Sequence, residues 1–148
     1  MTLEQILEMW KKDSGIDEHA LDDATRDAAK LHGKYLELLT ITKLQLKKAN
    51  VDLDAVLKDK WLYYNGKMDK KAIDQKGWAY DPFDGLSKPL KSDMDYYYNT
   101  DSDINQLKGR MDYLQTQKET LEEIINTLRW RHQNVRNMIE WRKFVSGG

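Results

Sequence analysis

The sequence predicts an all-α protein built mainly from long helices. Apolar residues recur at steps of three and four on both sides of the chain's middle segment, which is the period of an amphipathic helix. The last third carries a heptad pattern typical of a coiled coil. Both prolines, Pro82 and Pro89, lie in the middle segment, so neither breaks the flanking helical stretches. The length of 148 residues fits one domain, with an N-terminal helical region (1–65), a connector (66–101) and a C-terminal helical region (102–148).

The chain is predicted to open with a short amphipathic helix. Thr2 followed by Gln5 is a capping-box pattern, in which each side chain satisfies a backbone N–H of the other residue. Gly15 suits the end of this helix. Its apolar face carries Leu3, Ile6, Leu7 and Trp10.

A second, much longer helix is predicted from Asp17, acting as its N-cap, to residue 65, with Thr40–Thr42 as the place for a kink. Asn65-Gly66 is a good stop, because glycine readily takes the left-handed conformation that ends helices. The stripe facing the core runs in steps of three and four through Leu21, Ala24, Ala28, Leu31, Tyr35, Leu39, Thr42, Leu46, Ala49, Leu53, Val56, Lys60 and Tyr63.

Residues 66–101 interrupt the helical pattern. They contain three glycines, both prolines and a concentration of aromatic residues. We interpret them as an ordered connector, compatible with a short β-hairpin that pairs the region of Trp78–Tyr80 with Tyr96–Tyr98.

From Asp101 to about Phe144 the helical period resumes as heptads. Nine of the twelve a and d positions are apolar, which indicates a coiled-coil-like helix. Such a helix is longer than a compact globule of this size. Since the mean hydropathy is only −0.82, we expect the chain to form homo-oligomers. The a positions are Ile104, Met111, Lys118, Ile125, His132 and Ile139, and the d positions are Leu107, Leu114, Leu121, Leu128, Val135 and Arg142.

The C-terminal segment carries a second apolar face beside the heptad seam. Trp130 and Trp141 lie outside the a and d positions, so one helix can touch neighbours on two sides, which suits a ring. The rival interpretation is a second nucleic-acid surface, because arginines alternate with these aromatic residues. The residues predicted to mediate oligomerisation are Leu121, Ile125, Leu128, Val135, Met138, Ile139, Arg142 and Phe144.

Charge is segregated along the chain although the formal net charge is only −1. Residues 1–30 and 81–103 each carry −4, whereas residues 43–71 and 129–148 each carry +4. This pattern excludes a uniformly basic coat and favours distinct charged faces, which could also pair with one another between subunits. The sequence has no cysteine, no secretory leader pattern and no apolar run long enough for a membrane span, so we expect an intracellular protein.

No residue pattern indicates catalysis, a metal or a cofactor. His19, His32 and His132 lie far apart in the sequence and lack the spacing of metal ligands. The aspartates of residues 81–103 lack the spacing of a calcium loop, and Asp101 and Asp103 are better used as helix caps. Phosphate-binding and nucleophile-elbow motifs are also missing. We therefore expect a protein that is not an enzyme.

The segment Val56–Lys71 combines lysines with aromatic residues near the end of the second predicted helix. Lysines bind a phosphate backbone by charge, and aromatic rings stack with unpaired bases of any sequence. A helix end with buried aromatics and a solvated lysine face would give the same pattern. Two functions remain open: a single-stranded nucleic-acid-binding protein, or a structural coiled-coil adaptor. The candidate nucleic-acid-binding residues are Lys43, Lys48, Lys58, Lys60, Trp61, Tyr63, Tyr64 and Lys67.

The chain resembles the UvsY family of recombination mediator proteins from T-even-type bacteriophages. Residues 16–66 carry the similarity without a gap, and shorter matches follow in the same order to the C-terminus. The matching residues are Ile16, Asp17, Ala24, Tyr35, Lys43, Lys48, Leu57, Lys58, Lys60, Tyr63, Tyr64, Gly66, Lys91, Ser92, Met94, Asp101, Asp103, Arg131, Arg136, Arg142, Phe144 and Gly147.

The resemblance implies a mostly helical, non-enzymatic ring, a hexamer or heptamer, that binds single-stranded DNA. Such mediators help a phage RecA-like recombinase replace the single-strand-binding protein during recombination, repair and recombination-dependent replication, in the cytoplasm of the infected bacterium. The family's DNA-binding motif falls on Lys58 and Lys60, and its self-assembly region on about residues 129–147. The chain departs from the family at Asp59, between those two lysines, and in residues 67–90.

Overall fold

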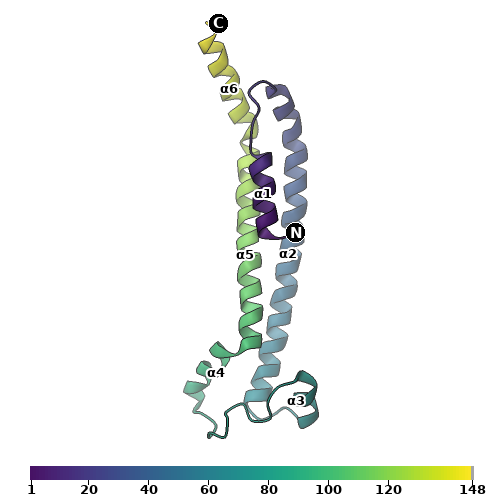
Figure 1. Ribbon diagram of the computed structural model, residues 1–148, viewed down its shortest axis with the longest axis vertical. Helices are drawn as coiled ribbons and strands as arrows, with labels where there is room; N and C mark the ends of the chain where they lie inside the picture. The colour runs from purple at the N-terminus through teal and green to yellow at the C-terminus, as the bar shows by residue number, and fades with distance from the viewer. Residues whose placement is uncertain (148) are drawn as a thin grey trace. The chain divides into compact units, whose positions relative to one another are not determined.

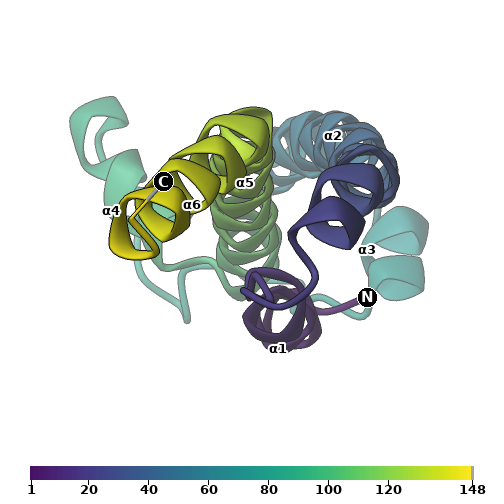
Figure 2. The ribbon, with the colours of Figure 1, turned by 90° about the horizontal axis from the view of Figure 1, so that it is seen from above.

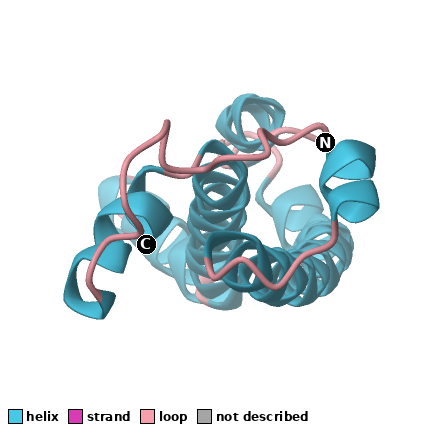
Figure 3. Cartoon of the chain, turned by 90° about the horizontal axis from the view of Figure 1, so that it is seen from below, coloured by secondary structure: helices cyan, strands magenta, loops and turns pink. Residues whose placement is uncertain are grey.

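The computed structural model describes residues 1–147. Within them the fold is all-α, without a strand, as the sequence predicts (Figure 3). The helices are α1 (Leu3–Asp13), α2 (Leu21–Tyr64), α3 (Lys70–Lys76), α4 (Met94–Thr100), α5 (Ser102–Arg129) and α6 (Arg131–Val145), and a 3-10 turn, η1 (Lys91–Asp93), precedes α4. The chain forms two compact units: unit 1 comprises Met1–Leu44 and Leu114–Gly148, and unit 2 comprises Gln45–Tyr113.

The ends of α1 and α2 follow local sequence signals, with one exception. The capping box of α1 is formed, since Thr2 accepts from the Gln5 N–H at 3.2 Å and Gln5 accepts from the Thr2 N–H at 2.9 Å. Gly66, with φ of 69°, follows the end of α2 as expected. The start of α2 is different: it begins at Leu21, because the Asp17 carboxylate accepts from the His19 N–H in a turn of its own. The helix then runs unbroken through Thr40–Thr42.

Unit 1 is built on the packing of α1 against α2 and α5 (Figures 1 and 2). A buried polar pair accompanies this core, where the Gln117 amide donates to the Thr42 hydroxyl at 2.8 Å. Heptad residues of α5 therefore pack against helices of their own chain. The core residues are Ile6, Tyr35, Leu39, Leu121, Ile124, Ile125 and Leu128.

The long C-terminal helix predicted from the heptads is broken at Trp130, which separates α5 from α6. At this break the buried a position moves by one residue, whereas the d position Val135 stays buried as predicted. His132, predicted at a core a position, is exposed, whereas its neighbour Arg131 is buried together with Val135. The prediction of a core His132 is therefore wrong, because the interruption at Trp130 places Arg131 instead of His132 on the buried side of α6.

In unit 2 the connector contains the short helices α3 and α4 joined by a loop, and the expected β-hairpin is wrong. Asp69 caps α3 by accepting from the Ala72 N–H at 2.7 Å, and residues Tyr96–Tyr98 lie inside α4. Helical spacing lets Tyr97 and Tyr98 pack on Tyr64 while Tyr96 remains exposed, which a strand pairing would not allow. The core of this unit consists of Tyr63, Tyr64, Ile73, Phe83 and Met94.

Among residues 1–147, no helix is both long and apolar enough to cross a membrane.

Candidate nucleic-acid interface

The last turns of α2 present a lysine–aromatic surface to solvent. Lys58 and Trp61 are exposed and lie three residues apart, so they share one side of the helix. Lys67, just beyond the helix, places its Nζ 4.5 Å from the centroid of the Trp61 ring. This surface, formed by Lys58, Trp61 and Lys67, joins an ammonium group to an aromatic ring within reach of a single nucleotide.

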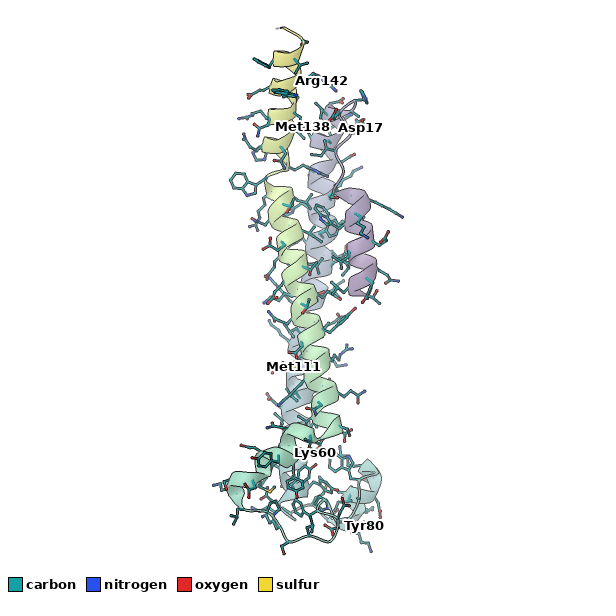
Figure 4. The ribbon with its side chains drawn as sticks, turned by 60° about the vertical axis from the view of Figure 1, so that its left-hand side comes forward. Asp17, Lys60, Tyr80, Met111, Met138 and Arg142 are labelled. Atoms are coloured by element: carbon teal, nitrogen blue, oxygen red, sulfur yellow. The ribbon has the colours of Figure 1, made fainter. Side chains whose placement is uncertain are left out.

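Lys60, predicted beside Lys58 in the same site, lies inside unit 2 and is only 4% exposed (Figure 4). Its Nζ is 3.0 Å from Asp101 Oδ2, 2.9 Å from Asp103 Oδ2 and 3.7 Å from the centroid of the Trp78 ring. Two carboxylates and a ring face thus surround the ammonium group. In this arrangement Lys60 does not present its charge to a phosphate in solvent, contrary to our expectation.

Tyr63 and Tyr64, which we also expected to stack with bases, are buried at 7% and 8% exposure. The Tyr63 hydroxyl donates to the Ala79 carbonyl at 2.5 Å, and the Tyr64 hydroxyl donates to Asp101 at 2.7 Å. Burial, helped by the nearby aspartates, raises the pKa of both phenols. Their rings build the core of unit 2 instead of an open stacking platform.

Asp101 holds this core together as an ionised group. Burial raises the pKa of its carboxyl, but hydrogen bonds from Tyr64, the Ile104 N–H and Lys60 outweigh burial, and the net pKa is lowered. The same carboxylate caps the start of α5, as the sequence predicts.

The two other predicted lysines, Lys43 and Lys48, are both exposed on α2, the first in unit 1 and the second in unit 2. Lys48 lies ten residues before Lys58, which places it roughly 80° away around the helix axis. Lys47, which we did not select, lies eleven residues before Lys58 and so shares its side of α2 to within about 20°. The eleven-residue spacing is the sequence signal that identifies Lys47.

The acidic residue that departs from the family pattern has a partner. Asp59 Oδ2 is 3.2 Å from the Nζ of Lys76 in α3. Part of the Asp59 charge is therefore compensated beside the surface of Lys58, Trp61 and Lys67. A second lysine–aromatic pair, also not selected from the sequence, lies in the connector: Lys70 Nζ is 5.0 Å from the centroid of the exposed Tyr80 ring. No spacing in the sequence predicts that pair, because it depends on the fold of α3 and the loop after it.

The predicted oligomerisation residues divide into buried and accessible groups. Leu121, Ile125, Leu128 and Val135 are at most 4% exposed within their own chain, and Met138 is half-buried. In α6, Ile139 and Phe144 are 38% and 76% exposed, and Phe144 stacks on Trp141 with ring centroids 5.6 Å apart.

Arg142 lies beside the loop between α1 and α2, close to Met138 and Asp17 (Figure 4). Its guanidinium donates to the Glu18 carbonyl in that loop. This interaction is within the chain and ties α6 to the start of α2.

In the part of the chain that the structure describes, no three acidic or histidine side chains come together as a metal site.

A sequence model of the family described as UvsY, recombination, repair and ssDNA binding protein, matches residues 9–148. Two crystal structures of the bacteriophage T4 recombination mediator protein UvsY are similar. The lattice type II structure has a TM-score of 0.82 at 21% identity over 99% of both chains. The lattice type IV structure has a TM-score of 0.78 at 19% identity over 97% of this chain and 98% of that one. No curated protein sequence matches the chain.

Proposed function

The chain belongs to the UvsY family of recombination, repair and single-stranded-DNA-binding proteins, and from this we propose that it is a non-enzymatic recombination mediator. It binds single-stranded DNA and promotes loading of a phage RecA-like recombinase in place of the single-strand-binding protein. Its place of action is the cytoplasm of the infected bacterial host.

The observation that carries this proposal is the exposed surface of Lys58, Trp61 and Lys67. The Trp61 ring can stack with an unpaired base, while the two lysines bind the phosphates on either side. Duplex DNA keeps its bases stacked inside, so such a surface favours a single strand. Lys47 and Lys48 extend the positive charge along the α2 segment of unit 2.

Self-assembly would raise the affinity of this small surface for a DNA strand. The exposed apolar residues of α6, including Trp141 and Phe144, are suited to contact a second copy of the chain. A closed ring repeats the surface in every subunit, and linked weak sites bind a strand more tightly than any one of them. Wrapping a strand around several subunits would also deform a bound protein–DNA filament, which favours exchange without ATP.

The test is a salt titration of single-stranded DNA binding. Changing Lys58 and Lys67 together to alanine should lower the slope of log K against log salt by about 0.7 for each lost phosphate contact. Trp61→Ala should weaken binding with little change in that slope, because stacking releases few ions. Lys108→Ala, an exposed lysine of α5 in unit 2, is the matched control and should leave the slope unchanged.

A wild-type protein that shows no preference for single strands would contradict the proposal. It would favour the alternative, a structural coiled-coil adaptor whose charged segments pair only with protein. Loading is tested separately, by measuring recombinase filament formation on DNA already covered by the single-strand-binding protein.

A further inference from the structure

A cavity of about 390 Å³ lies beyond the end of α2, inside unit 2. It is separate in its residues from the surface of Lys58, Trp61 and Lys67. Its lining combines aromatic rings with one amide and one ammonium group. The lining residues are Tyr63, Tyr64, Asn65, Gly66, Met68, Ile73, Tyr80, Pro82, Phe83 and Lys88.

Hydrogen bonds hold the walls of this cavity in place. Asp81 accepts from the Phe83 N–H at 2.9 Å and from the Gly85 N–H at 2.5 Å, which fixes the loop that carries Pro82 and Phe83. The Tyr80 hydroxyl donates to Asp74 of α3, so the orientation of that exposed ring is also constrained. A site with fixed walls binds a ligand without first ordering them.

The charges around the cavity differ between its interior and its rim. Burial is the main cause of the raised pKa of Tyr63, and the nearby carboxylates of Asp101, Asp81 and Asp84 raise it further. These carboxylates therefore disfavour an anion beside that phenol. At the rim, Lys88 Nζ donates to Asn65 Oδ1 at 3.1 Å and retains two further N–H donors. Lys70 lies over the Tyr80 ring. This distribution suits a ligand with a flat, uncharged part inside and an anionic part outside.

An unpaired nucleotide has this division between its base and its phosphate. We propose that the cavity binds one nucleobase of the single strand, with the Tyr80 ring as a stacking surface and Lys88 and Lys70 facing the adjoining phosphates. The proposal rests on the proposed function, and it adds a second base-binding position to the surface of Lys58, Trp61 and Lys67.

The first experiment compares two short strands of equal phosphate number, one with bases and one made of abasic sites. Tyr80→Ala should lose about tenfold in affinity for the strand with bases and little for the abasic strand. Tyr96→Ala is the matched control, since Tyr96 is an exposed tyrosine of unit 2 that does not line this cavity. Circular dichroism should show that both variants keep the wild-type helix content.

The second experiment observes the cavity without a DNA strand. Thymidine should shift the amide resonances of Gly66 and Met68 in the wild-type protein and shift them less in Tyr80→Ala. Ribose 5-phosphate, which has the anion without a base, should leave them unchanged. Shifts caused by the sugar phosphate and not by thymidine would overturn the proposal, because the cavity would then bind anions.

The two proposals fail in different ways. If the wild type binds single strands and Lys58→Ala with Lys67→Ala lowers the salt slope, but Tyr80→Ala behaves like the wild type on both strands, only the base subsite is wrong. If the wild type does not bind single strands at all, the proposed function fails and the subsite fails with it.

Discussion

Lys60 and Asp101 form a buried ion pair, with 3.0 Å between Nζ and Oδ2 and no more than 7% of either residue exposed. The pair joins the last turns of α2 to the start of α5 within unit 2. Both charges have further partners: Lys60 contacts Asp103 and the Trp78 ring, and Asp101 accepts from Tyr64 and Ile104. A buried pair of this kind stabilises the fold only as long as both members are present.

Removing the charge of Lys60 should therefore destabilise unit 2. Lys60→Met keeps most of the aliphatic stem but leaves the Asp101 carboxylate buried without its cation, at a cost of about 3 kcal/mol. Chemical denaturation followed by circular dichroism measures this loss. Lys58→Met, two residues away and exposed, should change the free energy of unfolding little. Equal stability of Lys60→Met and wild type would show that the pair contributes nothing to the fold.

The same pair makes stability depend on pH. The pKa of Asp101 is lowered in the folded protein, so its contribution is complete above the unfolded value near 4 and is lost as the pH falls toward the folded value. We expect the melting temperature to decrease as the pH is lowered below about 5. The decrease should be less steep in Asp101→Asn, which is already less stable than the wild type at neutral pH. Parallel pH profiles of the two proteins would contradict this assignment.

Arg131 should stabilise unit 1 by holding the end of α1. Its buried guanidinium donates to the carbonyls of Asp13 and Ser14 at 2.6 and 2.9 Å, where the helix leaves carbonyl groups unsatisfied. Arg131→Met should lower the free energy of unfolding by about 2 kcal/mol and speed hydrogen exchange in α1. Arg136→Met, an exposed arginine of the same α6 helix, should do neither. Unchanged exchange in α1 would mean that its docking depends on the apolar core alone.

The accessible and buried members of the predicted oligomerisation set should behave differently. Trp141→Ser with Phe144→Ser removes exposed apolar surface, so sedimentation should show a smaller assembly with unchanged helix content. Ile125→Asp places an unpaired charge in the core of unit 1, where it costs several kcal/mol, and should unfold the chain. A folded monomer produced by Ile125→Asp would identify that residue as an intersubunit contact instead.

Local signals predicted much of the helical architecture correctly. Thr2, Gln5 and Gly66 act through residues a few positions away, so their effect on helix ends can be read from spacing alone. Asp17 shows the limit of such signals, because its carboxylate can cap a helix or close a turn, and the fold uses the turn. The three tyrosines of α4 show another limit, since an aromatic cluster suits a strand or a helix until its packing partner is known.

The candidate site was only partly visible in the sequence. Lys58 and Trp61 are exposed as a DNA surface requires, whereas Lys60 belongs to the stripe of α2 that faces the core, four residues after Val56 and three before Tyr63. That register already indicated burial. The register could not identify the partner that compensates the buried charge of Lys60, because Asp101 lies far along the chain, at the start of α5.

By itself, then, the sequence determined the all-α class, the two ends of α1, the end of α2 and the mixture of lysine and aromatic residues near it, since these depend on period, local signals and composition. Only the tertiary structure decided which of those residues meet solvent, and that the heptad residues Leu121 and Ile125 pack in their own chain. The physical reason is that a helical period specifies which side of a helix is apolar, whereas the identity of the surface covering it depends on residues distant in the chain.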